Sequence, residues 1–194
     1  MCGFAVAIDW PGAEAVVQRL VQGILHRGDV TDPLLSPRAN TAMCTRRLRI
    51  VDAEHAIQPQ ISFNGRLAVS FNGEIYNHVE LRRELADLGV DFKTESDTEV
   101  LANALQVWGY RALERFVGMY AFVAIDLVSG EFLAARDPFG VKPLYIIQSE
   151  TGFLFCSEMR PLLQTVEVGD VLLLPPGFSL SLDNCRQLSH NPHP

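Results

Sequence analysis

The sequence predicts an α+β protein built from layered sheets. Segments with strand and helix patterns occur in runs and do not alternate strictly, which favours this class over a doubly wound parallel sheet. The chain has 194 residues, of which 48% are hydrophobic. It contains no internal repeat and no Gly/Ser/Pro-rich linker before its C-terminus. A chain of this length is expected to fold as one domain and to bury about 70% of the surface that it exposes when unfolded.

The first quarter of the chain has the pattern strand, helix, loop, strands. Residues Gly3 to Asp9 form an apolar run that ends at Trp10-Pro11-Gly12, which predicts a buried strand. Residues Ala13 to His26 place apolar side chains at helical spacing, with Gly28 just beyond the end. The segment Asp29 to Asn40 is rich in Asp, Pro and Ser and is expected to be a loop. Two further strands are predicted at Thr41 to Thr45 and Leu48 to Val51.

Two helices follow a strand in the middle of the chain. Residues Arg66 to Phe71 alternate as a strand and meet Asn72-Gly73, a pair that favours a tight turn. Asn77 with Glu80, and Ser96 with Glu99, each have the spacing of a capping box at the start of a helix. The remaining predicted strands, separated by turns with Gly or Pro, are Met119 to Asp126, Glu131 to Arg136, Lys142 to Gln148 and Gly152 to Ser157.

Charge and composition exclude several classes of partner. With 16 Lys and Arg against 23 Asp and Glu, the formal charge is −7, which argues against nucleic acid or an anionic membrane as the main partner. The apolar stretch Phe116 to Ile125 is far shorter than the roughly 20 residues that span a bilayer. The N-terminus lacks the basic region of a signal peptide, so a cytoplasmic protein is expected. The four cysteines have no CxxC spacing, which predicts neither a metal site nor a disulfide framework.

Cys2 is the candidate nucleophile. If the initiator Met is removed, this residue offers both a thiol and an α-amine whose pKa, near 8, lets it act as a base at neutral pH. The alternative is that Cys2 is a small hydrophobic residue at the start of a strand.

Five other positions suit acyl transfer on a zwitterionic substrate. Asn72 and the N–H of Gly73 are neutral donors of the kind that stabilise an oxyanion, the alternative being a plain hairpin turn. Glu74 and Asp97 could bind an ammonium group, although Asp97 beside Ser96 also suits a helix dipole. Arg47 could bind a carboxylate in bidentate fashion, or it is a solvated surface charge.

These residues, in this order, resemble the class II glutamine amidotransferase domain, an N-terminal nucleophile hydrolase. Among its relatives the similarity is greatest to the glutaminase domain of glutamine-hydrolysing asparagine synthetase, because Phe71 stands where the phosphoribosyl and sugar-phosphate amidotransferases usually carry a histidine. The similarity runs from Met1 to about Asp183. The segments that carry it are Met1 to Gly3, His26 to Gly28, Arg47 to Asp52, Gln58-Pro59, Asn72 to Asn77, Ser96 to Glu99, Gly118 to Phe122, Arg136 to Tyr145 and Ser157 to Met159.

The resemblance implies a four-layer αββα sandwich and a reaction. Mature Cys2 would attack the side-chain amide of L-glutamine, release ammonia and leave a glutamyl thioester that water hydrolyses to glutamate. Asn72 and Gly73 would form the oxyanion hole. The substrate would be held by Arg47 at its carboxylate, by Glu74 and Asp97 at its amino group, and by the Ile50-Val51 backbone as part of the pocket wall.

The resemblance also implies a partner. Residues 1–183 would form the glutamine amidotransferase domain. Residues 184–194 have little periodicity and are expected to form a mobile C-terminal tail. No ATP pyrophosphatase segment follows, so no cofactor is expected in this chain, and ATP and Mg are expected only on a synthetase partner that receives the ammonia for asparagine biosynthesis. The alternatives are a free-standing glutaminase or amidohydrolase, and a catalytically silent binding or regulatory module of the same fold. The segment after Gly28 departs from the usual family pattern, as does Thr45-Arg46.

Overall fold

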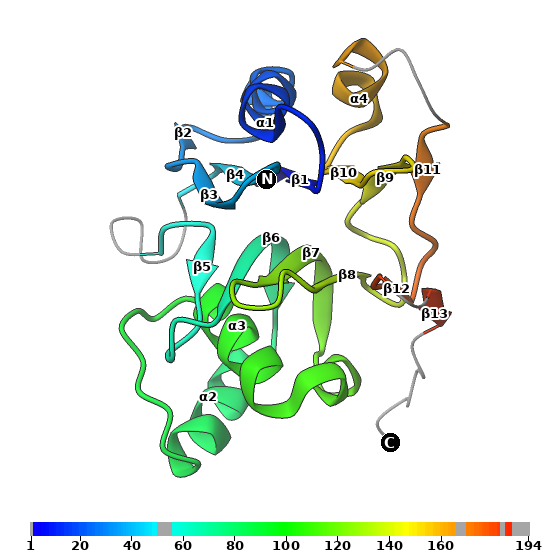
Figure 1. The fold of residues 1–194 in the computed structure, drawn as a ribbon. Coiled ribbons are helices and arrows are strands. Elements are labelled where there is room, and N and C mark those ends of the chain that lie inside the picture. The colour runs from blue at the N-terminus through cyan, green and yellow to red at the C-terminus, as the bar shows by residue number, and fades with distance from the viewer. Residues whose placement is uncertain (1, 50–55, 166–169, 183–184, 188–194) are drawn as a thin grey trace.

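Two antiparallel sheets stacked face to face form the centre of the protein, and helices cover both outer faces (Figure 1). The computed structural model describes residues 2–49, 56–165 and 170–182, and the backbone of residues 185–187. The layers are therefore helix, sheet, sheet, helix, as the resemblance implies. Every pairing between described strands is antiparallel.

The first sheet contains the N-terminal strand at its centre. Its order is β11-β9-β10-β1-β4-β2, and β3 also pairs with β4. Helix α1 and the shorter α4 cover its outer face (Figure 1). The elements are β1 (Gly3–Ile8), α1 (Ala13–Gln22), the 3-10 turn η1 (Leu25–Arg27), β2 (Val30–Thr31), β3 (Leu35–Arg38), β4 (Thr41–Arg47), β9 (Tyr145–Gln148), β10 (Phe153–Cys156), α4 (Met159–Thr165) and β11 (Leu172–Leu173).

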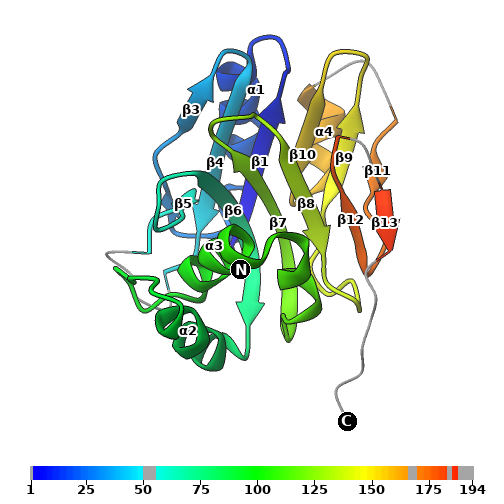
Figure 2. The same ribbon diagram turned by 60° about the horizontal axis from the view of Figure 1, so that its bottom comes forward.

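The second sheet has the order β13-β12-β8-β7-β6-β5, and α2 and α3 pack on its outer face (Figure 2). Its long central pair joins β6 to β7 over nine residues each. The elements are β5 (Gln60–Ile61), β6 (Leu67–Ile75), α2 (His78–Asp87), α3 (Asp97–Trp108), the 3-10 helix η2 (Gly109–Glu114), β7 (Gly118–Asp126), β8 (Phe132–Arg136), β12 (Phe178–Leu180) and β13 (Cys185–Gln187).

Alternation along the strands assigns their side chains to different cores. In β1, Phe4 and Val6 enter the core between the sheets, whereas Ala5 and Ala7 pack under α1. In β6, Ala68 belongs to the core between the sheets. The same rule places Cys2 on the side of Phe4, and Asn72 on the side of Ala68. The side chains of Cys2 and Asn72 therefore both face the space between the two sheets.

The prediction that a strand ends at Phe71 is wrong. Strand β6 continues through Asn72 and Gly73 to Ile75, so this pair is not a hairpin turn. The reason is that β7 pairs with the whole segment, from Leu67 opposite Asp126 to Ile75 opposite Gly118. A partner strand supplies hydrogen bonds that the local turn preference cannot offset.

The expected loop at Asp29 to Asn40 contains two short strands. Strand β2 pairs with β4 at Arg46 and Arg47, and β3 pairs with the start of β4. Both are edge strands, where Pro37 is tolerated because an edge N–H needs no partner. The predicted strand Leu48 to Val51 is not formed at Leu48 and Arg49, and Ile50 and Val51 lie outside the described residues.

The two predicted capping boxes differ in outcome. The Ser96 hydroxyl accepts a hydrogen bond from Glu99 N at 3.2 Å and caps α3. Asn77 precedes α2 without a side-chain cap, because its amide side chain bonds Arg115 O and Val117 N instead. The side chain thus ties the start of α2 to the connection that leads into β7.

The predicted domain limit at residue 183 stays a prediction. Residues 183–184 and 188–194 lie outside the described part, and the backbone of residues 185–187 pairs with β12. In the part of the chain that the structure describes, no helix is long and apolar enough to cross a bilayer.

Candidate active site

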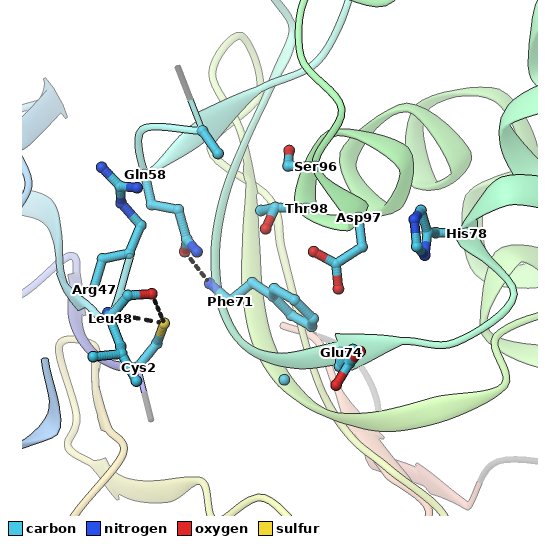
Figure 3. Close-up of a pocket in the computed structure, with 12 residues that line it drawn as sticks. Cys2, Arg47, Leu48, Gln58, Phe71, Glu74, His78, Ser96, Asp97 and Thr98 are labelled. Carbon is cyan, nitrogen blue, oxygen red and sulfur yellow. Dashed lines mark hydrogen bonds between the residues drawn. The ribbon is translucent and has the colours of Figure 1, made fainter. Parts of the chain in front are cut away.

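A cavity of about 170 Å³ lies where β1 begins and β6 ends, with α3 at its side. Five of the eight predicted site residues line it: Cys2, Arg47, Gly73, Glu74 and Asp97. Figure 3 shows Cys2 and Arg47 on one wall and Glu74 and Asp97 on the other. Residues more than 90 positions apart in the sequence thus meet in one small polar cavity, which suits a small molecule with charges at both ends. The other lining residues are Leu48, Ala56, Gln58, Phe71, His78, Ser96 and Thr98.

Cys2 is partly buried and its backbone is held in place. Leu48 N donates a hydrogen bond to the thiol sulfur at 3.3 Å, and the thiol contacts Leu48 O at 3.9 Å. Arg27 Nε donates to the Cys2 carbonyl oxygen at 2.9 Å, and Arg27 Nη1 pairs with Glu158 at 2.9 Å. His26 Nε2 is 2.7 Å from the same carboxylate. The His26-Arg27 and Ser157-Glu158 segments therefore work together to orient the residue that carries the thiol.

The pairing of β6 with β7 turns alternate N–H groups of β6 towards the cavity. Tyr120 O accepts a hydrogen bond from Asp137 N, so the backbone N–H and C=O of Tyr120 point towards β8. Gly73 is the residue of β6 opposite Tyr120, and its backbone N–H and C=O therefore point away from β7. Two neighbours with the same orientation are already engaged: Phe71 N donates to Gln58 Oε1 at 2.7 Å and Ile75 N to Asp97 Oδ2 at 2.9 Å. The Gly73 N–H lies between them and faces the cavity.

Position 73 accepts only glycine. A Cβ atom built there would overlap the carbonyl oxygen of Met119 and would lie 2.9 Å from the ring of Phe71. Because β7 approaches this closely, the backbone of β6 can serve the site at a point where no side chain covers it.

Asn72 supplies a second donor. Its side chain is 1% exposed, and no described residue accepts a hydrogen bond from Nδ2. A buried donor without a partner costs stability, and such groups are concentrated at sites with a functional reason for them. Asn72 does not line the cavity surface, but its amide faces the same space between the sheets as Cys2. The two predicted oxyanion donors thus lie on consecutive residues of one rigid strand.

Asp97 and Glu74 supply negative charge on the wall opposite Cys2 (Figure 3). Burial raises the pKa of the Asp97 carboxyl above 3.8, against the opposing effect of the hydrogen bond from Ile75 N. Nearby Glu74 acts in the same direction as burial, and His78 acts against it. The helix-dipole interpretation of Asp97 covers only part of its role, because its carboxylate also holds the end of β6 against the start of α3.

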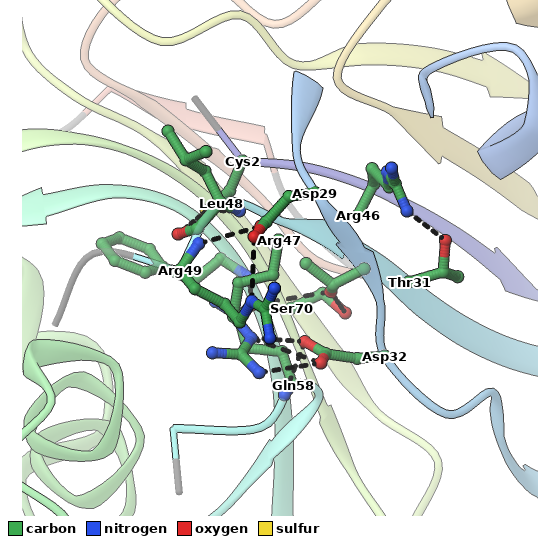
Figure 4. A network of polar contacts seen from close by, with 12 residues as sticks. Cys2, Asp29, Thr31, Asp32, Arg46, Arg47, Leu48, Arg49, Gln58 and Ser70 are labelled. Carbon is green, nitrogen blue, oxygen red and sulfur yellow. Dashed lines mark hydrogen bonds and ion pairs between the residues drawn. The ribbon is translucent and has the colours of Figure 1, made fainter. Parts of the chain in front are cut away.

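Arg47 is not the solvated surface charge that one interpretation expects. Arg47 is buried, with 6% of its surface exposed. Its guanidinium forms a two-point ion pair with Asp32, in which Nε lies 2.9 Å from Oδ2 and Nη2 lies 3.1 Å from Oδ1 (Figure 4). Asp32 is a site residue that the sequence reasoning missed. It lies in the segment after Gly28 that departs from the usual family pattern, and this departure is the feature of the sequence that could have pointed to Asp32.

Gln58 is a second residue that was missed as part of the site. Its backbone N donates to Asp32 Oδ2 at 3.1 Å, and its side-chain oxygen accepts from Phe71 N. It therefore joins the Arg47 pair to β6. Ile50 and Val51, predicted to form part of the pocket wall, lie outside the described residues. In the described ranges, no three His, Cys, Asp or Glu side chains form a group that could hold a metal ion.

The Arg136 to Tyr145 segment forms a tightly hydrogen-bonded turn. Asp137 accepts hydrogen bonds from the backbone N of Phe139, Val141 and Lys142, which closes a turn where Gly140 has a φ of 65°. Arg136 donates to three backbone carbonyls around the same turn. The turn fixes the end of β8 that supports β7.

Comparison with known proteins agrees with this geometry. The family model for the glutamine amidotransferase domain matches residues 1–172. This chain belongs to the class II glutamine amidotransferase family.

Several asparagine synthetases are similar in sequence to this domain. The amidotransferase domain is 35% identical over 169 residues to asparagine synthetase [glutamine-hydrolyzing] 1 of Bacillus subtilis, covering 84% of this chain and 27% of that protein. It is 34% identical over 186 residues to asparagine synthetase of Triphysaria versicolor, covering 93% and 31%. A putative asparagine synthetase of Mycobacterium tuberculosis H37Rv is 40% identical over 149 residues, covering 74% and 22%. The chain thus spans less than a third of the length of these relatives.

The fold is shared with a solved amidotransferase. Glutamine phosphoribosylpyrophosphate amidotransferase from B. subtilis, complexed with ADP and GMP, superposes with a TM-score of 0.80 at 22% identity, over 98% of this chain and 50% of that one. The αββα sandwich predicted for the amidotransferase domain is confirmed.

Proposed function

We propose that this domain hydrolyses the side-chain amide of L-glutamine to glutamate and ammonia through a thioester on Cys2. The observation that carries the proposal is the buried Nδ2 of Asn72, which has no hydrogen-bond partner among the described residues and lies next to the cavity-facing N–H of Gly73 on β6. Two such donors on a rigid strand suit the negative oxygen of a tetrahedral intermediate, which they stabilise without reorganising.

The reaction begins on Cys2. Once Met1 is removed, the α-amine of Cys2 takes the thiol proton and the sulfur attacks the amide carbon. The carbonyl oxygen becomes an oxyanion that accepts hydrogen bonds from Asn72 Nδ2 and Gly73 N. The intermediate expels ammonia, which receives the proton from the α-amine. Water then attacks the thioester carbon, and glutamate leaves as the thiol is restored.

The polar ends of the substrate match the two walls of the cavity. Glu74 and Asp97 bind the ammonium group of glutamine, and Arg47 binds its α-carboxylate. The Ile50-Val51 backbone, expected to complete the wall, stays a prediction. Because the ammonium group is held on the wall opposite Cys2, the γ-amide is directed towards the thiol.

The ammonia is supplied to an ATP-dependent ligase similar to asparagine synthetase. The relatives carry that name and extend well beyond the length of this chain. The ligase belongs to another chain or to a further segment, and ATP and Mg are bound there. The cytoplasmic location expected from the sequence stays a prediction.

A glutamine-to-glutamate assay tests the proposal directly. The wild type should form glutamate and ammonia in equal amounts, whereas Cys2→Ala should be inactive and correctly folded. Cys156→Ala, a change at a buried cysteine of β10, is the matched control and should keep its activity. Intact mass should show that Met1 has been removed from the active protein. Wild-type turnover by Cys2→Ala would overturn the proposal.

The partner is tested separately. Adding an asparagine-synthetase ligase domain with its ATP and aspartate should raise glutamine turnover and couple it to asparagine formation. A full glutaminase rate in the isolated domain, unchanged by any such ligase, would instead support a free-standing glutaminase.

A further inference from the structure

A second carboxylate already occupies the guanidinium that faces the substrate. Asp32 is 4% exposed, and both of its carboxylate oxygens accept hydrogen bonds from Arg47 (Figure 4). Its Oδ2 atom also accepts from Gln58 N at 3.1 Å. This is a bidentate, charge-assisted pair in a buried setting, which is the strong form of this interaction.

The backbone around Asp32 fixes the carboxylate in this position. Asp32 N donates to Thr45 O at 3.0 Å, and the Cys44 thiol donates to Asp32 O at 3.4 Å. A Cβ at Gly28 would overlap the carbonyl oxygen of Arg47, so the preceding chain lies directly on β4. The backbone hydrogen bonds to β4 therefore place the Asp32 carboxylate beside Arg47, and Asp32 is a buried residue and not a surface side chain.

The pair changes the charge that a substrate meets. Arg47 is the only Arg or Lys among the described residues that line the cavity, where Glu74 and Asp97 are both acidic. Asp32 balances the charge of Arg47 before any substrate arrives. A substrate carboxylate on the same guanidinium would also lie close to the Asp32 carboxylate, and like charges repel strongly when removed from water.

We propose that Asp32 is a specificity-determining residue that competes with the substrate's α-carboxylate for Arg47. The inference rests on the proposed glutaminase function and extends it to the substrate class. A free α-carboxylate therefore adds little to the affinity of the site for its substrate. Glutamine derivatives whose α-carboxylate is esterified or amidated bind nearly as tightly as glutamine itself. Recognition comes chiefly from the ammonium group, which Glu74 and Asp97 bind.

Equilibrium binding to Cys2→Ala tests the inference without turnover. The ligands are L-glutamine and L-glutamine α-methyl ester, and calorimetry gives the ratio of the ester Kd to the glutamine Kd. In the Cys2→Ala protein with Asp32 intact, this ratio should be below about tenfold, which corresponds to the free energy of one modest charged hydrogen bond. Asp32→Asn keeps the shape and an acceptor oxygen but removes the charge, and it should raise the ratio by about tenfold through tighter glutamine binding.

The controls use neighbouring residues. Asp29→Asn lies three positions earlier and removes the exposed ion pair with Arg49, so it should leave the ratio unchanged. The double variant Asp32→Asn/Arg47→Gln removes both charges and should return the ratio to the wild-type value. Thermal melting verifies that each variant is folded.

The inference is overturned by any of three results. These are an unchanged ratio in Asp32→Asn, a fall in glutamine affinity with ester affinity kept, or a ratio above about a hundredfold in the protein with Asp32 intact. The last result needs no variant, so it decides the matter even if Asp32→Asn does not fold. Failure to bind either ligand also overturns it. The glutaminase proposal fails by a different result, which is turnover that does not depend on Cys2.

Discussion

The carboxylate of Asp97, at the first residue of α3, accepts a hydrogen bond of 2.9 Å from the backbone N of Ile75, at the last residue of β6. This contact fixes a helix that carries one side of the cavity to the strand that carries the oxyanion donors. The same carboxylate faces the cavity, so one residue links the geometry of the two walls to the binding of an ammonium group.

Acidification should weaken glutamine binding earlier than an ordinary aspartate would predict. Burial raises the pKa of Asp97 above 3.8, so as the pH falls its charge is lost sooner, and the KM for glutamine rises. In Asp97→Asn the KM should be high, and that part of its pH dependence should disappear. A wild-type KM that stays flat through the acidic range would contradict this role.

The same carboxyl should cost stability at neutral pH. Because its pKa is higher in the folded than in the unfolded state, the folded state is favoured while the group is protonated, and this advantage is lost as the pH rises through the raised pKa. Asp97→Asn should therefore melt at a higher temperature than the wild type at pH 7, and the difference should shrink in acid. Melting curves at several pH values test this.

Asn72→Ala should lose kcat by about 100- to 1,000-fold, the usual effect of removing one oxyanion donor. Its free energy of unfolding should change by no more than about 2 kcal/mol, because Nδ2 has no partner to lose in the described structure. Ser70→Ala is the matched control on the same face of β6, two residues earlier, and should keep most of its activity. Equal rates for the two variants would exclude Asn72 from the oxyanion hole.

Gly73→Ala should fail for a different reason. The new methyl group would overlap the carbonyl of Met119 and force β6 away from β7. We expect a loss of more than about 2 kcal/mol in stability together with the loss of activity. Denaturant unfolding and the glutaminase assay would be run in parallel, and a fully stable, active variant would show that the strands tolerate this displacement.

Alkylation should distinguish the cysteines of the folded protein. Burial raises the pKa of Cys44 to about 11 and that of Cys156 to about 12, so both thiols are protonated and inaccessible at neutral pH. Iodoacetamide should therefore modify Cys2 faster than either, and excess glutamine should slow that reaction. Peptide mass mapping over time measures each rate, with Cys2→Ala as the control. Labelling of Cys156 as fast as Cys2 would contradict the burial of its thiol.

Much of the fold could be predicted because it depends on local patterns. The apolar run of β1, the spacing of α1 and the Ser96 cap of α3 each lie within a few adjacent residues. The outcome at Asn72-Gly73 was different, because a partner strand more than 40 residues later continues β6 through the pair. Helix α4 and the short edge strands were also missed, since their patterns are too brief to stand out from the loops around them.

For the site, the chemical groups could be identified from the amino-acid sequence: a thiol at position 2, donors at Asn72 and Gly73, acids at Glu74 and Asp97, and a cation at Arg47. How these groups are engaged depends on the fold. It placed Asp32 on Arg47, Ile75 N on Asp97 and nothing described on Asn72 Nδ2. The physical reason is that charge balance and hydrogen-bond satisfaction depend on neighbours in space, and strand pairing across distant segments selects those neighbours.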